Sequence, residues 1–194
     1  MNFIEAVNQM ISTRRSVYTN MFSGEEVPDS IIMQMLENAN WAPTHRLTEP
    51  WRFIVFKGAG LEKLGNYQGE LYKNKSGENY KEEVFDKFKN KPTECSHVIA
   101  IGMKRDEQHR VPEVEEVCAT ACAVQNMLLT ASAHRIGCYW STGGVTFYEE
   151  AKPFFGLGEE DMLLGFLYLG MLKSDKWPVG RRQGIEGKVQ WVSE

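Results

Sequence analysis

The sequence has 194 residues, the size of one ordinary domain. Hydrophobic residues make up 42% and charged residues 25%, a balance that is typical of globular proteins and excludes disordered and collagen-like chains. The net charge is -4 and no run of lysine and arginine dominates the chain, which argues against general nucleic-acid binding. The longest apolar stretches, residues 98–103 and 162–172, are shorter than the roughly 20 residues that span a bilayer.

The cysteines and the first residues bear on the cellular compartment. Cys95, Cys118, Cys122 and Cys138 are few for this length and have no dense framework spacing, which favours reduced thiols. Glu5 stands where a secretory signal needs an unbroken apolar core. We therefore expect a cytoplasmic protein that is not inserted in a membrane.

The first third of the chain predicts two helices and a strand. Apolar residues recur at helical spacing over residues 3–13, which predicts an amphipathic helix. A second helix follows Pro28-Asp29 and should end near residues 41–43, because a residue before proline avoids the helical region. After a polar loop over residues 42–50, the apolar run 51–57 predicts a strand buried on both faces.

The middle of the chain is more polar. Leu61 and Leu64 indicate a short helix, and the lysine-rich residues 66–94 predict a helical excursion whose aromatic side chains point inward. The run HVIAIGM over residues 97–103 predicts a second buried strand.

The last part of the chain again alternates helices and strands. Residues 113–135 form a long helix that is rich in small residues and apolar over a wide arc, so we expect it to be buried inside the domain or against a second subunit. A short strand breaks into a glycine loop over residues 137–144, a helix follows at about 147–155, and a strand covers 163–171. The tail, residues 173–194, has apolar side chains near its end, so we expect it to be docked on another surface. This alternation predicts a single α/β or α+β domain.

Two sets of residues resemble cofactor or metal sites but have a simpler interpretation. Gly58-Ala59-Gly60 follows a strand, yet Lys63 stands where a dinucleotide fingerprint needs a third glycine, so we expect a strand-to-helix turn. Cys118 and Cys122 share a helix face without further ligands nearby, so we expect them to pack as small hydrophobes rather than to bind a metal. The usual hydrolase and phosphotransfer motifs are absent from the sequence, and no side chain is assigned as catalytic.

Basic residues near both ends of the chain allow two interpretations. Arg14-Arg15-Ser16 follows the first helix, where arginines complement the helix dipole, but guanidinium groups beside a hydroxyl could also clamp a phosphate. Arg181-Arg182 could close such a clamp from the other end of the sequence, or could be a solvated surface pair.

Two loops could contact a flat ligand. The loop over residues 41–51 contains His45 and Glu49 and is stiffened by prolines, so it could hold one edge of a heterocycle. The segment Ser141-Thr142-Gly143-Gly144 could bring backbone N–H groups close to a ligand, or could be a tight turn after a strand.

Together these pieces resemble the nitroreductase family of flavin mononucleotide (FMN) enzymes, in particular its small single-domain NAD(P)H nitroreductases. The resemblance covers nearly the whole chain and depends on the order of short motifs, which are RRS (14–16), VPDSIIMQMLENANWAP (27–43), THRLTEPWRF (44–53), GCYWSTGG (137–144), GFLYLG (165–170) and GRRQGIEGKVQW (180–191). It implies one FMN-binding domain over residues 1–194. It also implies an α+β fold, a three-layer α/β/α sandwich with a mixed, mainly antiparallel central sheet. The extended C-terminal tail would dock on the partner subunit of a homodimer.

The resemblance also assigns residues to the cofactor. Arg14, Arg15 and Ser16 would contact the FMN phosphate and ribityl chain, and Arg182 with its neighbour Arg181 would contact the phosphate from the tail. His45 and Glu49 would approach the flavin from the second subunit. The ring would be bordered by Trp140, Ser141, Thr142 and Gly143, with a backbone N–H near the flavin N5. Glu49 departs from the glutamine or asparagine of many relatives, and Tyr18 stands where many carry a third basic residue.

The implied activity is electron transfer. NADH or NADPH would reduce FMN, and a nitroaromatic, a quinone or a similar small-molecule acceptor would reoxidise it in a ping-pong cycle. Two other classes stay open on the sequence. One is a flavin protein of the same fold with another role, such as reductive dehalogenation, flavin destruction or flavin carriage without catalysis. The other is an interaction protein whose arginine pairs are only surface charge.

Overall fold

The computed structural model describes residues 2–193. The helices are α1 (Phe3–Thr13), α2 (Asp29–Ala39), α3 (Ala59–Ser76), α4 (Glu82–Asn90) and α5 (Glu113–Ala133). The strands are β1 (Trp51–Lys57), β2 (His97–Met103), β3 (Gly137–Ser141) and β4 (Met162–Gly170). A 3-10 helix over Glu149–Phe155 stands where the helix at about 147–155 was predicted. Within residues 2–193, no helix is both long and apolar enough to cross a membrane.

The four strands form one sheet in the order β1-β2-β4-β3. All three neighbouring pairs are antiparallel, so the parallel pair expected of a mixed sheet is not found within the described part of this chain. The connections explain this. The helical hairpin α3–α4 returns the chain to the same end of the sheet, so β2 begins beside the end of β1, with Lys57 opposite His97, and the two strands are antiparallel. The single helix α5 makes β3 run parallel to β2, but β4 lies between them.

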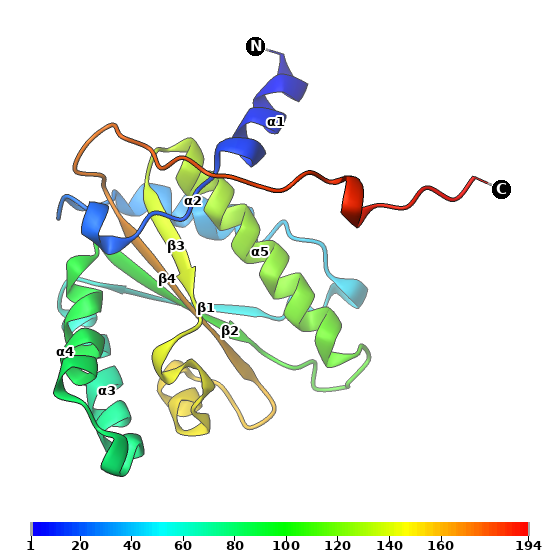
Figure 1. Ribbon diagram of the computed structural model, residues 1–194. Coiled ribbons are helices and arrows are strands. Elements are labelled where there is room, and N and C mark those ends of the chain that lie inside the picture. Colours follow the sequence, from blue (N-terminus) through cyan, green and yellow to red (C-terminus); the bar gives the residue numbers. More distant parts are fainter. Residues whose placement is uncertain (1, 194) are drawn as a thin grey trace.

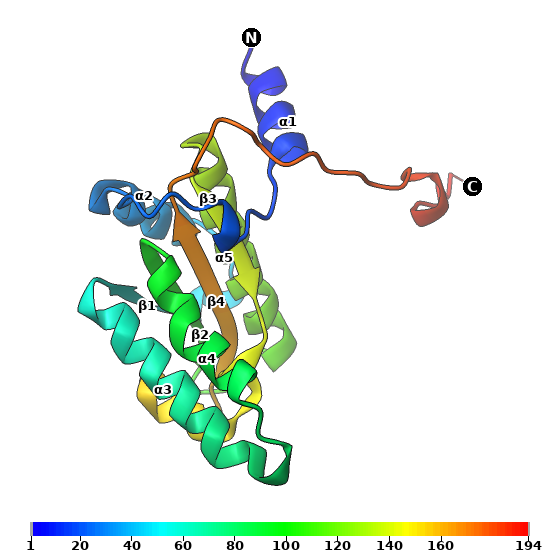
Figure 2. The ribbon, with the colours of Figure 1, turned by 60° about the vertical axis from the view of Figure 1, so that its left-hand side comes forward.

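Helices cover both faces of the sheet, which confirms the three-layer α/β/α architecture (Figure 1; Figure 2). Successive residues of β2 point to opposite faces. Ile99 and Ile101 belong to the core cluster beneath α2 and α5, which contains Met127. Val98 and Ala100 belong to the second cluster, on the face covered by α3 and α4. β2 is buried along its whole length, as predicted.

Two predictions about the first half of the fold are wrong. β1 is an edge strand, so it is only partly buried, and Val55 is 37% exposed. The short helix around Leu61 is 18 residues long, because Gly65 and Gly69 do not break it. They let α3 approach α4 closely, since a Cβ at Gly65 would lie 2.0 Å from the Lys89 carbonyl oxygen. The predicted turn at Gly58 is confirmed by its left-handed φ of 51°.

The helix α5 is buried on one side only. Ala119, Ala123 and Met127 face the sheet and are buried, whereas Cys118 and Cys122 are exposed. The prediction that these two cysteines pack as buried hydrophobes is therefore wrong for the single chain. A helix that is apolar over a wide arc has a second stripe that its own sheet cannot cover.

The first helix and the C-terminal tail project from the body of the molecule (Figure 1; Figure 2). No residue of α1 is buried, and Phe3 is 84% exposed. Trp191 near the end of the tail is 92% exposed. The apolar residues at the end of the tail, such as Val189 and Val192, are exposed on their own chain, and docking of this end on a partner subunit stays a prediction.

Candidate functional site

The arginine pair after α1 is held against the start of β3. The helix ends at Thr13 because Arg14 takes an extended ψ of 132° while its N–H donates to the Met10 carbonyl at 3.1 Å. Two residues beyond Arg15, the Val17 N–H donates to the Cys138 carbonyl at 3.0 Å. The segment between these two bonds is therefore fixed at both ends, and both arginines are half-buried.

The C-terminal tail is tied to the end of α1. The Trp177 indole N–H donates to the Thr13 carbonyl at 2.9 Å. The Arg135 guanidinium lies 4.8 Å from the Trp177 ring centroid and donates to the Asp175 carbonyl at 2.8 Å. Sequence reasoning did not single out Trp177 or Arg135, although a tryptophan in a polar tail is a signal for a docking point. These contacts carry the tail across the arginine pair.

Both ends of the chain line one cavity of about 470 Å³. Its described lining residues include Arg14, Arg15 and Arg182, and none of them is acidic. Ser16 is exposed and outside this lining, and so is Arg181, whose carbonyl accepts a hydrogen bond from the Arg182 Nη1 at 2.9 Å. The structure thus brings three of the five basic-motif residues together.

The donor groups in this cavity fit an anionic oxygen ligand such as a phosphate. Arg15 Nη1 donates to the carbonyls of Ser12 and Arg14, both at 2.7 Å. The buried Arg15 Nε has no hydrogen-bond partner among residues 2–193. A buried donor without a partner is costly, and guanidinium groups pair well with phosphate oxygens.

The far end of β3 is shaped by a bulge in β4. The register between β2 and β4 shifts at Ile101, opposite Gly165. Gly165 has a φ of 114°, and a Cβ there would lie 2.3 Å from the Ser141 carbonyl oxygen. The Trp140 indole N–H donates to the Leu164 carbonyl at 2.8 Å, which fixes that ring. Gly165 was not predicted as a site residue, but only glycine permits this close approach.

A second cavity of about 620 Å³ lies at this end of β3. Trp140 and Thr142 are among its lining residues, whereas Ser141 and Gly143 are not. The Gly143 carbonyl instead accepts a hydrogen bond from the Thr146 hydroxyl at 2.9 Å. Four residue steps of about 3.3 Å, or roughly 13 Å, separate the two ends of β3.

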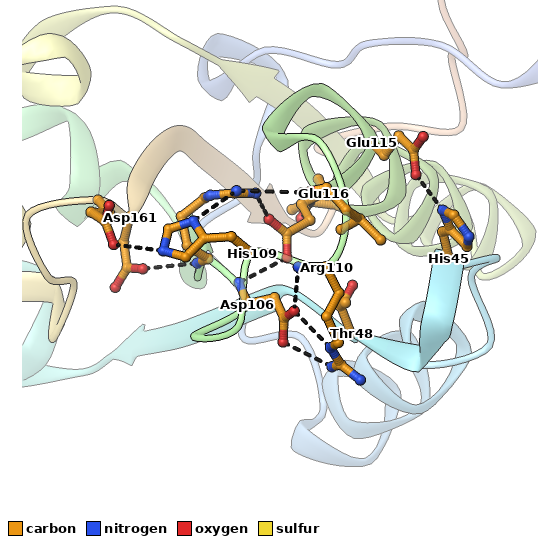
Figure 3. Close-up of polar contacts among 12 residues, drawn as sticks. His45, Thr48, Asp106, His109, Arg110, Glu115, Glu116 and Asp161 are labelled. Carbon is orange, nitrogen blue, oxygen red and sulfur yellow. Dashed lines mark hydrogen bonds and ion pairs between the residues drawn. The ribbon is translucent and has the colours of Figure 1, made fainter.

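The loop with His45 and Glu49 lies elsewhere in the chain. His45 Nδ1 is 2.6 Å from the Glu115 carboxylate at the start of α5 (Figure 3). Arg46, Leu47 and Glu49 all have positive φ, between 43° and 52°, which is strained for residues other than glycine. Neither His45 nor Glu49 lines the arginine cavity or the cavity beside Trp140.

A polar cluster that sequence reasoning missed organises the loop between β2 and α5 (Figure 3). The Glu116 side chain is 1% exposed, forms an ion pair with Arg105, and accepts the Asp106 N–H at 2.9 Å. Asp161 accepts the Arg105 N–H at 2.9 Å. A glutamate on the buried face of an apolar helix is the signal that could have revealed this cluster. Among residues 2–193, no group of three or more metal-ligating side chains comes together.

The comparisons with known proteins agree with this architecture. The model of the Nitroreductase family matches residues 11–171. "Putative NAD(P)H nitroreductase YfhC" of Bacillus subtilis (strain 168) is 33% identical over 165 residues, which are 84% of this chain and 83% of that protein. The crystal structure of a nitroreductase-like family protein from Bacillus cereus covers 100% of both chains with a TM-score of 0.80 and 27% identity.

A more distant structure shares the fold alone. The FMN-dependent nitroreductase NfnB from Mycobacterium smegmatis, in complex with NADPH, has a TM-score of 0.75 at 17% identity and covers 99% of this chain and 100% of its own. The family match begins inside α1, just before Arg14, and ends just after β4. Since it spans the whole sheet and the first arginine pair, the chain belongs to the nitroreductase family.

Proposed function

We propose that this protein is an FMN-dependent oxidoreductase that passes reducing equivalents from NADH or NADPH to a nitroaromatic, a quinone or a similar acceptor. The observation that carries the proposal is the cavity in which Arg14, Arg15 and Arg182 meet. The mutual repulsion of guanidinium groups from both ends of the sequence opposes their convergence on one small space, and a bound anion would offset that repulsion. Membership of the nitroreductase family supports FMN as the source of that anion.

The chain's own residues bind and orient the cofactor. Bound FMN supplies the hydride-accepting and hydride-donating chemistry. Arg14, Arg15 and Arg182 bind its phosphate end, with Ser16 and Arg181 beside them. The backbone of residues 140–143, at the other end of β3, borders the ring. A donor and an acceptor that use the same ring face in turn give ping-pong kinetics, and no side chain of this protein is required as a general acid.

We further propose that the 194 residues form one FMN-binding domain that works as a homodimer. The exposed apolar side chains of α1, such as Phe3, and of the tail, such as Trp191, favour burial against a second copy. His45 and Glu49 line neither cavity of their own chain, so a second copy is needed to bring them to the flavin. The strained backbone at Glu49 also favours a functional position.

Spectroscopy of the purified protein tests the proposal. We expect a yellow protein that releases FMN on denaturation, is bleached by NADH or NADPH without oxygen, and regains its colour with a nitroaromatic. A protein that stays colourless with added FMN would contradict the flavin assignment. A flavoprotein that neither nicotinamide bleaches would retain the cofactor but contradict the activity.

A further inference from the structure

The cavity of about 620 Å³ beside Trp140 and Thr142 has walls suited to an aromatic molecule. Val117 of α5, Phe147, and Met162 and Leu164 of β4 form its apolar surface together with Trp140. Phe147 is 77% exposed although its ring borders the cavity. Largely apolar pockets with a few fixed polar groups are typical of small-molecule sites.

The charges around this cavity are unfavourable to an anion. Five carboxylates belong to its lining, and they are those of Glu113, Glu149, Glu159, Glu160 and Asp161. The two permanently charged cations of the lining, Arg105 and Lys152, already form ion pairs within the protein. Arg105 forms the buried ion pair with Glu116. Lys152 lies 2.5 Å from the Glu149 carboxylate and donates to the Glu159 carbonyl at 3.0 Å. An anionic ligand would therefore enter an acidic space without a free cation.

His109 supplies a directed hydrogen-bond donor in the wall of this cavity. Arg105 Nη2 lies 3.3 Å from His109 Nδ1, and a guanidinium group can only donate. Nδ1 therefore accepts, which places the proton of the neutral ring on Nε2. His109 Nε2 is 3.5 Å from the Glu160 carboxylate, longer than a good hydrogen bond, so this N–H is available to a ligand.

The loop that carries His109 is held in one conformation (Figure 3). His109 has a φ of 47°, a strained value for this residue, and its N–H donates to the Asp106 carbonyl at 2.8 Å. The carboxylates of Glu116 and Asp161 fix the backbone N–H groups of Asp106 and Arg105, each at 2.9 Å. A donor that is oriented before the ligand arrives loses little entropy on binding.

We propose that this cavity binds the electron acceptor as an aromatic molecule without negative charge, and that the His109 Nε2–H donates to an oxygen of that acceptor. The inference rests on the proposed function, because Trp140 and Thr142 are among the residues proposed to border the flavin ring. His109 is then a specificity-determining residue, and the acidic lining excludes anionic aromatics.

Binding to the FMN-loaded protein without any nicotinamide tests the charge requirement, since the ligands are then not reduced. The probes are 4-nitrobenzyl alcohol, 4-nitrobenzylamine and 4-nitrobenzoate, measured by calorimetric titration at low and high salt. We expect the alcohol and the amine to bind at least about tenfold more tightly than the carboxylate, with the difference shrinking as salt screens the charges. A carboxylate that binds as tightly as the alcohol would overturn the proposal.

Three variants test the donor. His109→Gly keeps the left-handed backbone but removes the imidazole Nε2–H. His109→Asn tolerates a positive φ and keeps a side-chain donor, its amide NH₂ group. We expect His109→Gly to weaken binding of 4-nitrobenzyl alcohol about tenfold, and His109→Asn to restore part of the loss. His134→Asn, at the other end of α5 where His134 contacts Gln34, is the control and should bind as the unaltered protein does. Equal weakening in His109→Gly and His109→Asn would contradict the donor role, and so would no weakening in either.

The two proposals fail separately. If neither NADH nor NADPH bleaches the flavin, the proposed function is wrong whatever the nitro compounds do. If the flavin is bleached and reoxidised but 4-nitrobenzoate is preferred, the proposed function stands and the assignment of this cavity and of His109 is wrong.

Discussion

Gly180 of the tail lies directly over the guanidinium group of Arg15. A Cβ at this position would be 2.2 Å from Arg15 Nε, so the tail can cross the arginine only at a residue without a side chain. The contact positions Arg182, two residues further on, in the same cavity as Arg14 and Arg15. The arrangement of the proposed phosphate site therefore depends on one glycine.

Gly180→Ala is expected to weaken FMN binding, because the new methyl group must displace either Arg15 or the tail. We expect a loss of about tenfold in affinity, the scale of one charge-assisted hydrogen bond. The affinity is measured by titrating FMN into the apo-protein while the quenching of flavin fluorescence is monitored. Gly187→Ala is the matched control, since a Cβ at Gly187 meets nothing within 4 Å. Equal affinities for both variants would show that the crossing at Gly180 does not shape the site.

Arg14→Ala should cost more than Arg181→Ala. Arg14 lines the arginine cavity and Arg181 does not, although both are arginines of the predicted clamp. We expect Arg14→Ala to reduce the free energy of FMN binding by about 1.5–3 kcal/mol, and Arg181→Ala to change it by less than about 1 kcal/mol. The same titration at two salt concentrations distinguishes a direct contact between the arginine and the phosphate from long-range attraction between their charges, which salt screens. A larger loss for Arg181→Ala would reverse the roles assigned to them.

Arg105→Ala should strongly destabilise the fold. It would leave the Glu116 carboxylate, which is 1% exposed, without its cation. Removing one partner of a buried ion pair costs about 3–5 kcal/mol of unfolding free energy. Lys104→Ala is the control, because its pair with Glu107 is exposed and should contribute less than about 1 kcal/mol. Urea unfolding measures both, and similar losses in the two variants would contradict the importance of burial.

His97 should make the stability of the protein depend on pH. Burial lowers the pKa of His97 from its usual value of 6.5, and the hydrogen bond to Asp29 opposes the shift only in part. The unfolded chain therefore binds a proton at His97 more readily than the folded chain does. The contribution of neutral His97 to the free energy of unfolding is complete above about pH 6.5 and is lost as the pH falls below that value.

Urea unfolding between pH 7.5 and pH 5 measures this effect, with the pH values chosen to bracket about 6.5. His97→Gln should show a flatter decline of stability over this range than the unaltered protein. His134→Gln is the control, since His134 is exposed. An unchanged decline in His97→Gln would mean that another group titrates.

Local patterns in the sequence were sufficient for most elements. The helices over α1 and α5 and the strands β2 and β3 were predicted close to their observed bounds, because periodicity and apolar runs depend on neighbouring residues. The same patterns failed where the length or the burial of an element depends on residues that are distant in the sequence but close in space. The helix around Leu61 was predicted to be short although Gly65 packs closely on α4 within it, and β1 was predicted to be buried although no strand of the described chain lies on its outer side.

The sequence by itself determined the order of the elements, the family resemblance and the presence of two basic segments near the ends of the chain. Only the tertiary structure decided that Arg182 lines one cavity with Arg14 and Arg15 while Arg181 does not, and that the Arg105 guanidinium lies beside His109 Nδ1. The physical reason is that these facts depend on single contacts between distant residues. The Trp177 indole on the Thr13 carbonyl, the bare Gly180 over Arg15, and the Arg105 guanidinium beside His109 leave no periodic trace in the sequence.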